Sequence, residues 1–253
     1  MACYGLDTEW LKRTFLFGVD LTDDDQNPYP SELFDLAIDA AIEIVEAETG
    51  IWIKQRVVTN EMHDLVAGDW LRDYQFEVIG SPLKSVQRIL FQHGDFASIE
   101  IPSNWIHIRD EDTGLIDIIR GQGSFVFRGG PLWAESGLSP TFLGWSVNTR
   151  LPGHLRVSYT AGFLPGRQLP ALVKLCVGHI AAMLPLDTAG DLIVGAGIAS
   201  YSKSMDGISE SVSTTSSATN AGYGARILSY QKQLERNMSA LRSQYRGVQA
   251  MVI

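Results

Sequence analysis

The chain has 253 residues, of which 45% are hydrophobic, 19% charged and 9% aromatic. This is enough apolar material for a sizeable core, so the composition excludes a wholly disordered chain. Two cysteines, Cys3 and Cys176, are too few for a disulfide framework or a four-cysteine zinc site. No apolar run reaches the roughly 20 residues of a membrane helix, and Asp7 and Glu9 interrupt any signal peptide. We therefore expect a soluble protein made inside the cell.

The formal net charge of -9 is unevenly distributed along the chain. Residues 1–50 carry twelve acidic residues against Lys12 and Arg13, whereas the last 32 residues are basic. The overall acidity argues against a protein that coats nucleic acid, because phosphate binding favours a basic surface. The asymmetry indicates either two solvated faces or a subunit whose two ends meet oppositely charged neighbours.

The first clear helix is predicted over residues 30–48, after a shorter helix over 7–17. Its apolar stripe recurs at helical spacing and comprises Leu33, Phe34, Ala37, Ile38, Ala41, Ile44 and Val45. The opposite face is acidic and carries Asp35, Asp39, Glu43 and Glu46. This face is either solvated or covered by a basic surface, and we assign it as a candidate contact between subunits.

Between residues 55 and 161 the apolar period changes to two, which is typical of strands. Short β-type runs occur at Val57–Val58, Phe76–Ile79, Val86–Phe91, Trp105–Ile108, Leu115–Ile119, Phe125–Phe127 and Leu155–Tyr159. Turn signals such as Asp112-Thr113-Gly114 separate them. The pattern predicts an antiparallel β-rich block inserted between helices.

An apolar helix is predicted to begin at Pro170 and to end before Pro185. Apolar residues lie on nearly all its sides, so we expect it to form the central core element. At about fifteen residues it is too short to span a bilayer.

Residues 186–221 are rich in small and polar residues and predict an extended loop with a hairpin. The expected strands, Ile198–Ser204 and Ile208–Thr214, flank an Asp-Gly turn. The candidate contact residues of this hairpin are Ser202, Lys203, Ser204, Asp206 and Gly207. We expect the hairpin to project from the core and to contact another molecule.

The last helix is predicted over about Tyr223–Tyr245 and combines an apolar seam with a basic edge. The seam comprises Ile227, Gln231, Leu234, Met238, Leu241 and Tyr245. The candidate partner interface comprises Arg226, Lys232, Arg236, Arg242, Arg246 and the apolar tail residues Val248, Met251, Val252 and Ile253. The tail either docks into a partner or folds back on its own domain.

The sequence contains few motifs that suggest catalysis, cofactor binding or metal binding. Residues 191–200 imitate a glycine-rich dinucleotide loop, but Ser200 stands where the third glycine is required and no helix is predicted to follow. The five histidines, His63, His93, His107, His154 and His179, are dispersed and have no ligand-type spacing. We therefore expect no cofactor, no metal and no enzymatic activity.

The fold class predicted is α+β: a helical scaffold with an inserted antiparallel β-rich block, an extended polar hairpin and a long C-terminal helix. The expected domains are residues 1–185, 186–221 and 222–253. The order of an acidic helix ending in Ala47-Glu48-Thr49-Gly50, then Pro82–Val86, Val157–Phe163 and Leu169-Pro170 resembles the head-tail connector (adaptor) proteins of tailed bacteriophages. Many members of that family are shorter and mostly helical, whereas this chain carries a large β block.

The resemblance implies a structural subunit of the virion neck. Such subunits form a ring, commonly of twelve copies, beneath the portal protein, and extend the DNA channel towards the tail. The hairpin would then project towards this channel or the next ring. The implied partners are other copies of the chain, the portal, a downstream neck or tail protein, and DNA that passes without sequence-specific binding; no membrane is implied. The alternatives are a soluble protein or enzyme that holds a ligand in its β block, and another neck ring subunit such as a tail terminator.

Overall fold

The computed structural model describes residues 4–23, 25–66, 74–93, 97–119, 150–194, 200–205, 208–213 and 223–246. The chain divides into two units. The helical unit comprises Met1–Gly50 and Leu164–Ser243, and the β unit comprises Ile51–Phe163 and Gln244–Ile253. The division differs from the expected one, in which residues 1–185 formed a single core, because the β block has a hydrophobic core of its own.

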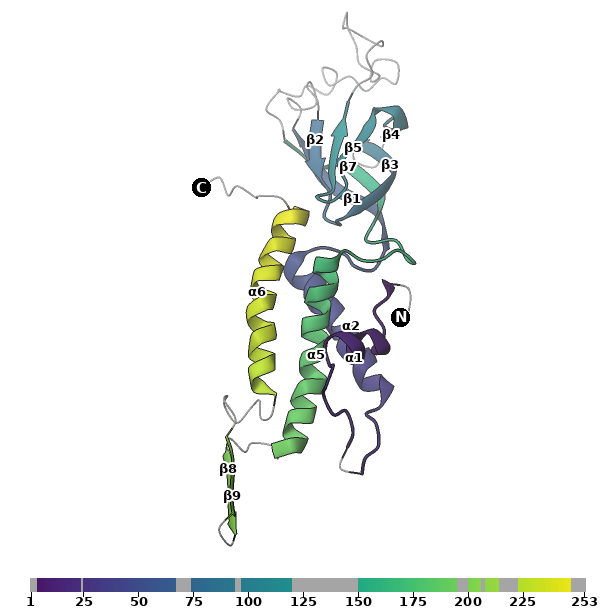
Figure 1. The fold of residues 1–253 in the computed structure, drawn as a ribbon. Helices are drawn as coiled ribbons and strands as arrows, with labels where there is room; N and C mark the ends of the chain where they lie inside the picture. Colours follow the sequence, from purple (N-terminus) through teal and green to yellow (C-terminus); the bar gives the residue numbers. More distant parts are fainter. Residues whose placement is uncertain are drawn as a thin grey trace, which may run out of the picture. The chain divides into compact units, whose positions relative to one another are not determined.

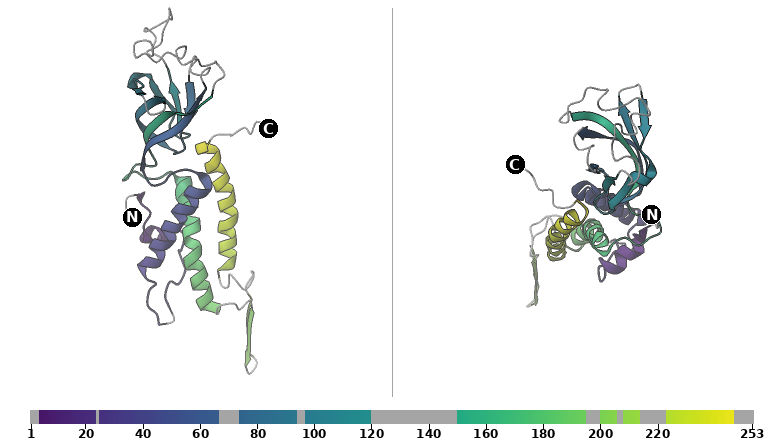
Figure 2. Two further views of the ribbon diagram at one scale, coloured as in Figure 1. Left: turned by 180° about the vertical axis from the view of Figure 1, so that it is seen from behind. Right: turned by 90° about the horizontal axis from the view of Figure 1, so that it is seen from above.

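The helical unit contains α1 (Thr8–Thr14), α2 (Ser31–Thr49), α5 (Ala171–Val194) and most of α6 (Gly224–Arg246). Figure 1 shows α5 between α6 on one side and α1 and α2 on the other, and the views in Figure 2 agree. The α+β class is confirmed, with the long helix at the C-terminal end of the chain.

Local signals explain the ends of the first two helices. The Asp7 carboxylate accepts a hydrogen bond from the backbone N–H of Trp10 at 2.7 Å and caps α1. Gly50 ends α2 in a left-handed conformation that glycine adopts without strain, at φ 72°. α1 is shorter than predicted, since residues 15–17 lie beyond its C-terminal end.

The buried face of α2 differs from the predicted stripe, in which Leu33 is only half-buried and Ile44 is exposed. Phe34, Ala37, Ile38, Ala41, Ile42, Val45 and Thr49 are buried, whereas the predicted Ile44 is 42% exposed. Ile42 takes its place because a helix of 3.6 residues per turn brings position 42, and not 44, onto the arc of Ile38 and Val45.

α5 runs through Pro185 and ends at Val194, which corrects the predicted end before Pro185. A proline within a helix costs about 3 kcal/mol, but Leu186 and Ala189 beyond it are 0% and 2% exposed and bury the continuation. Ala171–Leu192 is thereby long and apolar enough to cross a membrane by length and composition, so the expectation that the helix is too short was wrong. Half of this stretch is buried within the protein, where α5 packs on α2.

His179 of α5 is buried between two aromatic rings of the helical unit. Its ring centroid lies 5.3 Å from that of Phe15 and 4.8 Å from that of Tyr230 of α6. Among the described residues, its Nδ1 atom has no hydrogen-bond partner. Burial therefore lowers the pKa of His179 below its usual value of 6.5.

A pH dependence of stability follows from this burial. In the unfolded chain His179 binds a proton below about pH 6.5, whereas the folded helical unit resists that proton, so the free energy of unfolding falls as the pH drops from 7 to 5. The His179→Phe variant should lose this part of the pH dependence, and the exposed control His107→Gln should keep it. Urea unfolding at the two pH values measures the effect. The explanation is refuted if the unfolding free energy of His179→Phe falls between pH 7 and pH 5 as much as that of the wild type.

The described strands of the β unit form two antiparallel sheets. The first has the order β1 (Arg56–Val66), β7 (Arg150–Ala161), β3 (Leu83–His93) and β4 (Ala97–Glu100). The second has the order β2 (Tyr74–Glu77), β6 (Leu115–Ile118) and β5 (Ile106–Asp110), which follows the short helix η2 (Ser103–Trp105). The predicted strand at residues 125–127 lies outside the described residues.

Side chains from both sheets form the core of the β unit. Leu65 of β1, Ile89 of β3 and Val157 of β7 lie in one cluster with Phe76 of β2 and Ile116 of β6, and each is at most 8% exposed. As predicted, the β strands of this block lie between α2 and α5 in the sequence.

A third sheet links α5 to α6 in the sequence. β8 (Ser200–Met205) and β9 (Ile208–Ser213) pair antiparallel, from Ser200 opposite Ser213 to Met205 opposite Ile208. Among the described strands they pair only with each other. The backbone of the predicted hairpin is therefore present; its turn residues Asp206 and Gly207, and the loop at 195–199, lie outside the described residues.

Candidate functional site

The predicted basic edge of α6 contains two groups of cations. Those of the first donate hydrogen bonds to backbone carbonyl oxygens of the helical unit, and those of the second are exposed without such bonds among the described residues. Arg226 belongs to the first group. Its guanidinium donates to the backbone carbonyl oxygens of Phe15 at 2.6 Å and Phe17 at 3.1 Å, and its Nε donates to the Tyr230 hydroxyl at 3.0 Å. Arg226 therefore joins the start of α6 to the segment after α1 within one chain, and its assignment to a partner interface stays a prediction.

Arg242 has a similar role near the other end of α6. Its Nε donates to the carbonyl oxygen of Glu48 at 2.8 Å, and its Nη2 lies 3.2 Å from the Glu48 carboxylate. The carbonyl belongs to the last turn of α2, where a cation is favourable beside the negative end of the helix. Arg242 thus joins α6 to α2 within one chain; its side chain is 52% exposed, and its assignment to a partner interface stays a prediction.

The other cations, Lys232, Arg236 and Arg246, are exposed. Arg246 lies within electrostatic range of Glu77, where burial raises the pKa of that carboxyl and the Arg246 charge opposes the rise. The tail residues Val248, Met251, Val252 and Ile253 lie outside the described residues. In the helical unit, Lys232 and Arg236 are exposed cations on α6, as is Arg242, whose side chain is 52% exposed.

The acidic residues predicted on α2 lie on the side of the helix away from its buried face. Asp35 and Glu43 are exposed, and Asp39 and Glu46 are half-buried. Asp35 accepts a hydrogen bond from the Thr8 hydroxyl at 3.2 Å. The predicted hairpin residues Ser202, Lys203 and Ser204 lie on β8, opposite Ser211, Glu210 and Ser209.

Stability measurements should separate Arg226 from an exposed cation of α6. Arg226→Ala should destabilise the helical unit by about 2 kcal/mol, because hydrogen bonds from a charged donor to two carbonyl oxygens are lost. Arg236→Ala removes an equally long cation that is exposed on the same helix, and should change stability by less than about 0.5 kcal/mol. Chemical denaturation of both variants is the measurement, and equal stabilities would contradict this role of Arg226 within the chain.

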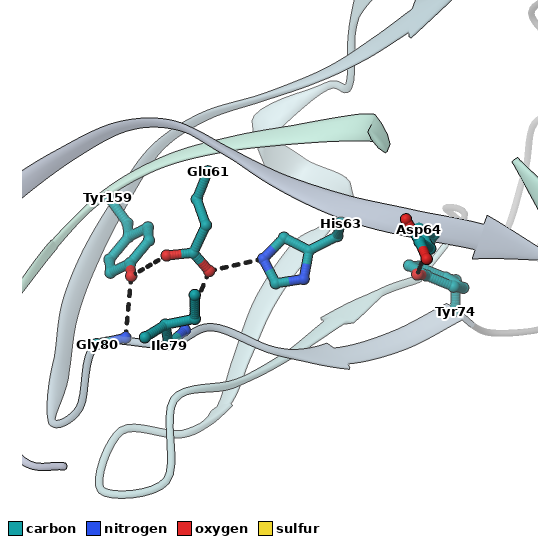
Figure 3. Close-up of polar contacts among 7 residues, drawn as sticks. All are labelled: Glu61, His63, Asp64, Tyr74, Ile79, Gly80 and Tyr159. Carbon is teal, nitrogen blue, oxygen red and sulfur yellow. Dashed lines mark hydrogen bonds and ion pairs between the residues drawn. The ribbon is translucent and has the colours of Figure 1, made fainter. Parts of the chain in front are cut away.

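The β unit contains a polar cluster around Glu61 that the sequence analysis did not identify. Glu61 accepts a hydrogen bond from the backbone N–H of Ile79 at 3.0 Å, contacts His63 Nε2 at 2.8 Å, and accepts one from the Tyr159 hydroxyl. The Tyr159 oxygen in turn accepts from the N–H of Gly80 at 3.0 Å. Figure 3 shows both Glu61 oxygens engaged, one by Tyr159 and the other by His63 and Ile79.

The electrostatics of this cluster follow from its burial and its donors. The Glu61 side chain is 8% exposed. Burial raises the pKa of its carboxyl, but hydrogen bonds from His63, Tyr159 and the Ile79 N–H outweigh burial and hold that pKa below its usual 4.5. Burial and the neighbouring carboxylate raise the pKa of Tyr159 well above its usual 10.0.

A second acidic side chain lies beside the cluster on the same strand. Asp64 accepts hydrogen bonds from the Arg150 Nε at 2.9 Å and from the N–H of Gly153 at 3.0 Å, and its backbone carbonyl accepts from the Tyr74 hydroxyl at 2.8 Å. The acceptors of both carboxylates are thus used within the β unit. The arrangement holds the turn at residues 79–80 and the start of β7 to β1, which is a structural role.

The comparisons with known proteins give no relative in which these residues could be examined. Neither the scan against models of protein families nor the search of curated proteins found a match. The function is therefore inferred from the surfaces of the chain itself: the α2 acids, the exposed α6 cations and the β8–β9 hairpin.

Proposed function

We propose that the chain is a structural head-to-tail adaptor of a tailed phage, forming a ring beneath the portal that extends the DNA channel. One observation carries the proposal: a hairpin of polar strands that pairs only with itself among the described strands. A two-stranded hairpin alone is at best marginally stable in water. Its six-residue strands, SYSKSM and ISESVS, offer few apolar side chains for burial. Such an element is stabilised by contacts with neighbouring molecules, as in a ring.

Charge supports the same role. The chain carries a net charge of -9, and an acidic or neutral channel wall lets DNA phosphates pass without binding them. The helical unit also has acids on α2 and exposed cations on α6. Contacts between two different surfaces of identical subunits close into rings when the rotation between neighbours permits it.

The role is tested by light scattering of the full chain at physiological salt, with and without the portal protein of the same phage. A ring, formed alone or on the portal, is the expected result. A monomer in both samples would overturn the proposal, and a monomer that binds a small molecule in its β unit would establish the alternative of a ligand-binding protein.

Hydrogen exchange tests the part assigned to the hairpin. We expect fast exchange of the β8 and β9 amides in the isolated subunit and slower exchange in the assembled ring, because only neighbours cover the hairpin. Strong protection in the monomer would show that the hairpin belongs to the core of its own subunit.

A further inference from the structure

The exposed face of α2 carries an apolar row that the helical unit leaves uncovered. Leu36 and Ile44 are 63% and 42% exposed, and Ala40 and Ala47 are exposed as well. At 100° per residue the four side chains fall within an arc of about 80° on the side away from the buried face. Single exposed leucines are ordinary, but a continuous row marks a surface that another molecule covers.

An acidic row borders this apolar row. Asp35, Asp39 and Glu43 follow one another at intervals of four residues, and Asp39 and Glu43 are about 6 Å apart along the helix axis. Rows of residues four apart are the ridges through which helices pack on one another.

α6 presents the complementary row. Leu228, Lys232 and Arg236 are also four residues apart; Leu228 is 41% exposed, and both cations are exposed. Lys232 and Arg236 have the same axial separation as Asp39 and Glu43, about 6 Å. This row lies on the side of α6 away from the helix's buried residues Ile227, Met238, Leu241 and Tyr245, which are at most 4% exposed.

We infer that the acidic and apolar face of α2 docks on the Leu228-Lys232-Arg236 row of α6 in a neighbouring copy of the chain. The inference rests on the proposed ring and names its subunit contact. Charge complementarity between two surfaces of one chain makes a second copy the occupant. It reassigns Lys232 and Arg236 from the candidate partner interface to the contact with the next subunit.

The direction of the helices fixes the alignment. Figure 1 shows α2 and α6 running the same way within the helical unit, and the contact between Glu48 and Arg242 joins their C-terminal ends. Rotation about a ring axis roughly parallel to these helices keeps α2 of one copy parallel to α6 of the next. Placing Glu43 level with Arg236 then brings Asp39 level with Lys232, and Leu228 beside Leu36.

Cross-linking tests the alignment. In a Cys3→Ser background of the full chain, Leu36→Cys and Leu228→Cys together should give a ladder of covalent oligomers with a short bis-maleimide, because each copy offers one cysteine to each neighbour. Cys176 is buried and does not contribute. Leu36→Cys alone should give dimers at most, and the control pair Leu175→Cys with Leu228→Cys, in which Leu175 is 42% exposed on α5, should give no ladder.

Charge reversal tests the pairing. Glu43→Arg and Arg236→Glu should each weaken self-association about tenfold, and their combination in one chain should restore it, since every contact then has the reversed pair. Arg13→Glu, an exposed cation on α1, is the matched control and should have no effect. One outcome is that the wild-type chain forms a ring while the double-cysteine variant gives no ladder and the double charge reversal gives no rescue. In that case this contact is wrong and the ring proposal stands. A wild-type chain that stays monomeric with and without the portal overturns both.

Discussion

Replacing Gly178 with alanine should lower the stability of the helical unit by about 3 kcal/mol, near the upper end of the usual cost of overpacking a core. A Cβ atom at this position in α5 would lie 2.1 Å from Cε2 of Phe15, far inside van der Waals contact. The Phe15 ring cannot move aside easily, because it is 8% exposed and packs edge-on against Trp10, His179 and Tyr230. In a helix with free space beside the glycine, the same substitution would raise the free energy of unfolding by about 1 kcal/mol.

A double-mutant cycle isolates the cause. Phe15→Leu makes room beside position 178, so Gly178→Ala should cost much less in that background than in the wild type. Urea unfolding of the four proteins gives the coupling energy. A Gly178→Ala variant as stable as the wild type would mean that the Phe15 ring does not pack against α5 at this point.

Glu61→Gln should have the second large effect, a loss of about 2 to 3 kcal/mol at neutral pH. Glutamine has the same shape but only one acceptor oxygen, so it cannot accept from Tyr159 and from the Ile79 N–H together. Glu111→Gln is the control, because Glu111 is 64% exposed in its pair with Lys84 and should contribute little.

The pH dependence of this difference follows from the lowered pKa of Glu61. The folded state favours the ionised carboxylate, so its contribution is present above pH 4.5 and is lost as the pH falls through the lowered pKa. The gap in unfolding free energy between wild type and Glu61→Gln should therefore shrink as the solution is acidified below pH 4.5. A gap that stays constant at low pH would show that the hydrogen bonds do not depend on the charge.

The helices were predictable because their apolar periods are strong and their ends carry local signals. α2 ends one residue from the predicted position, at the left-handed Gly50, and α6 ends at Arg246, again one residue away. The end of α5 was not predictable from Pro185, because burial of Leu186 and Ala189 outweighs a local penalty. That burial depends on tertiary packing, which a local pattern does not contain.

The site assignments were less predictable, for a related reason. Arg226 and Arg242 bind backbone carbonyl oxygens of Phe15 and Glu48, and any residue type could supply those acceptors. Glu61 meets Tyr159 across 98 positions of sequence, next to an irregularity in the pairing of β1 with β7. The only local signal is that Glu61 and His63, two residues apart on one strand, share a face.

The central claim is that copies of this chain form a closed ring through two different surfaces. Electron cryo-microscopy of the 253-residue chain mixed with the proposed portal partner is a direct test. We expect a closed ring around a central channel, in which α2 of each copy lies parallel to α6 of the next with Glu43 beside Arg236. Single, separated copies on the portal would contradict it.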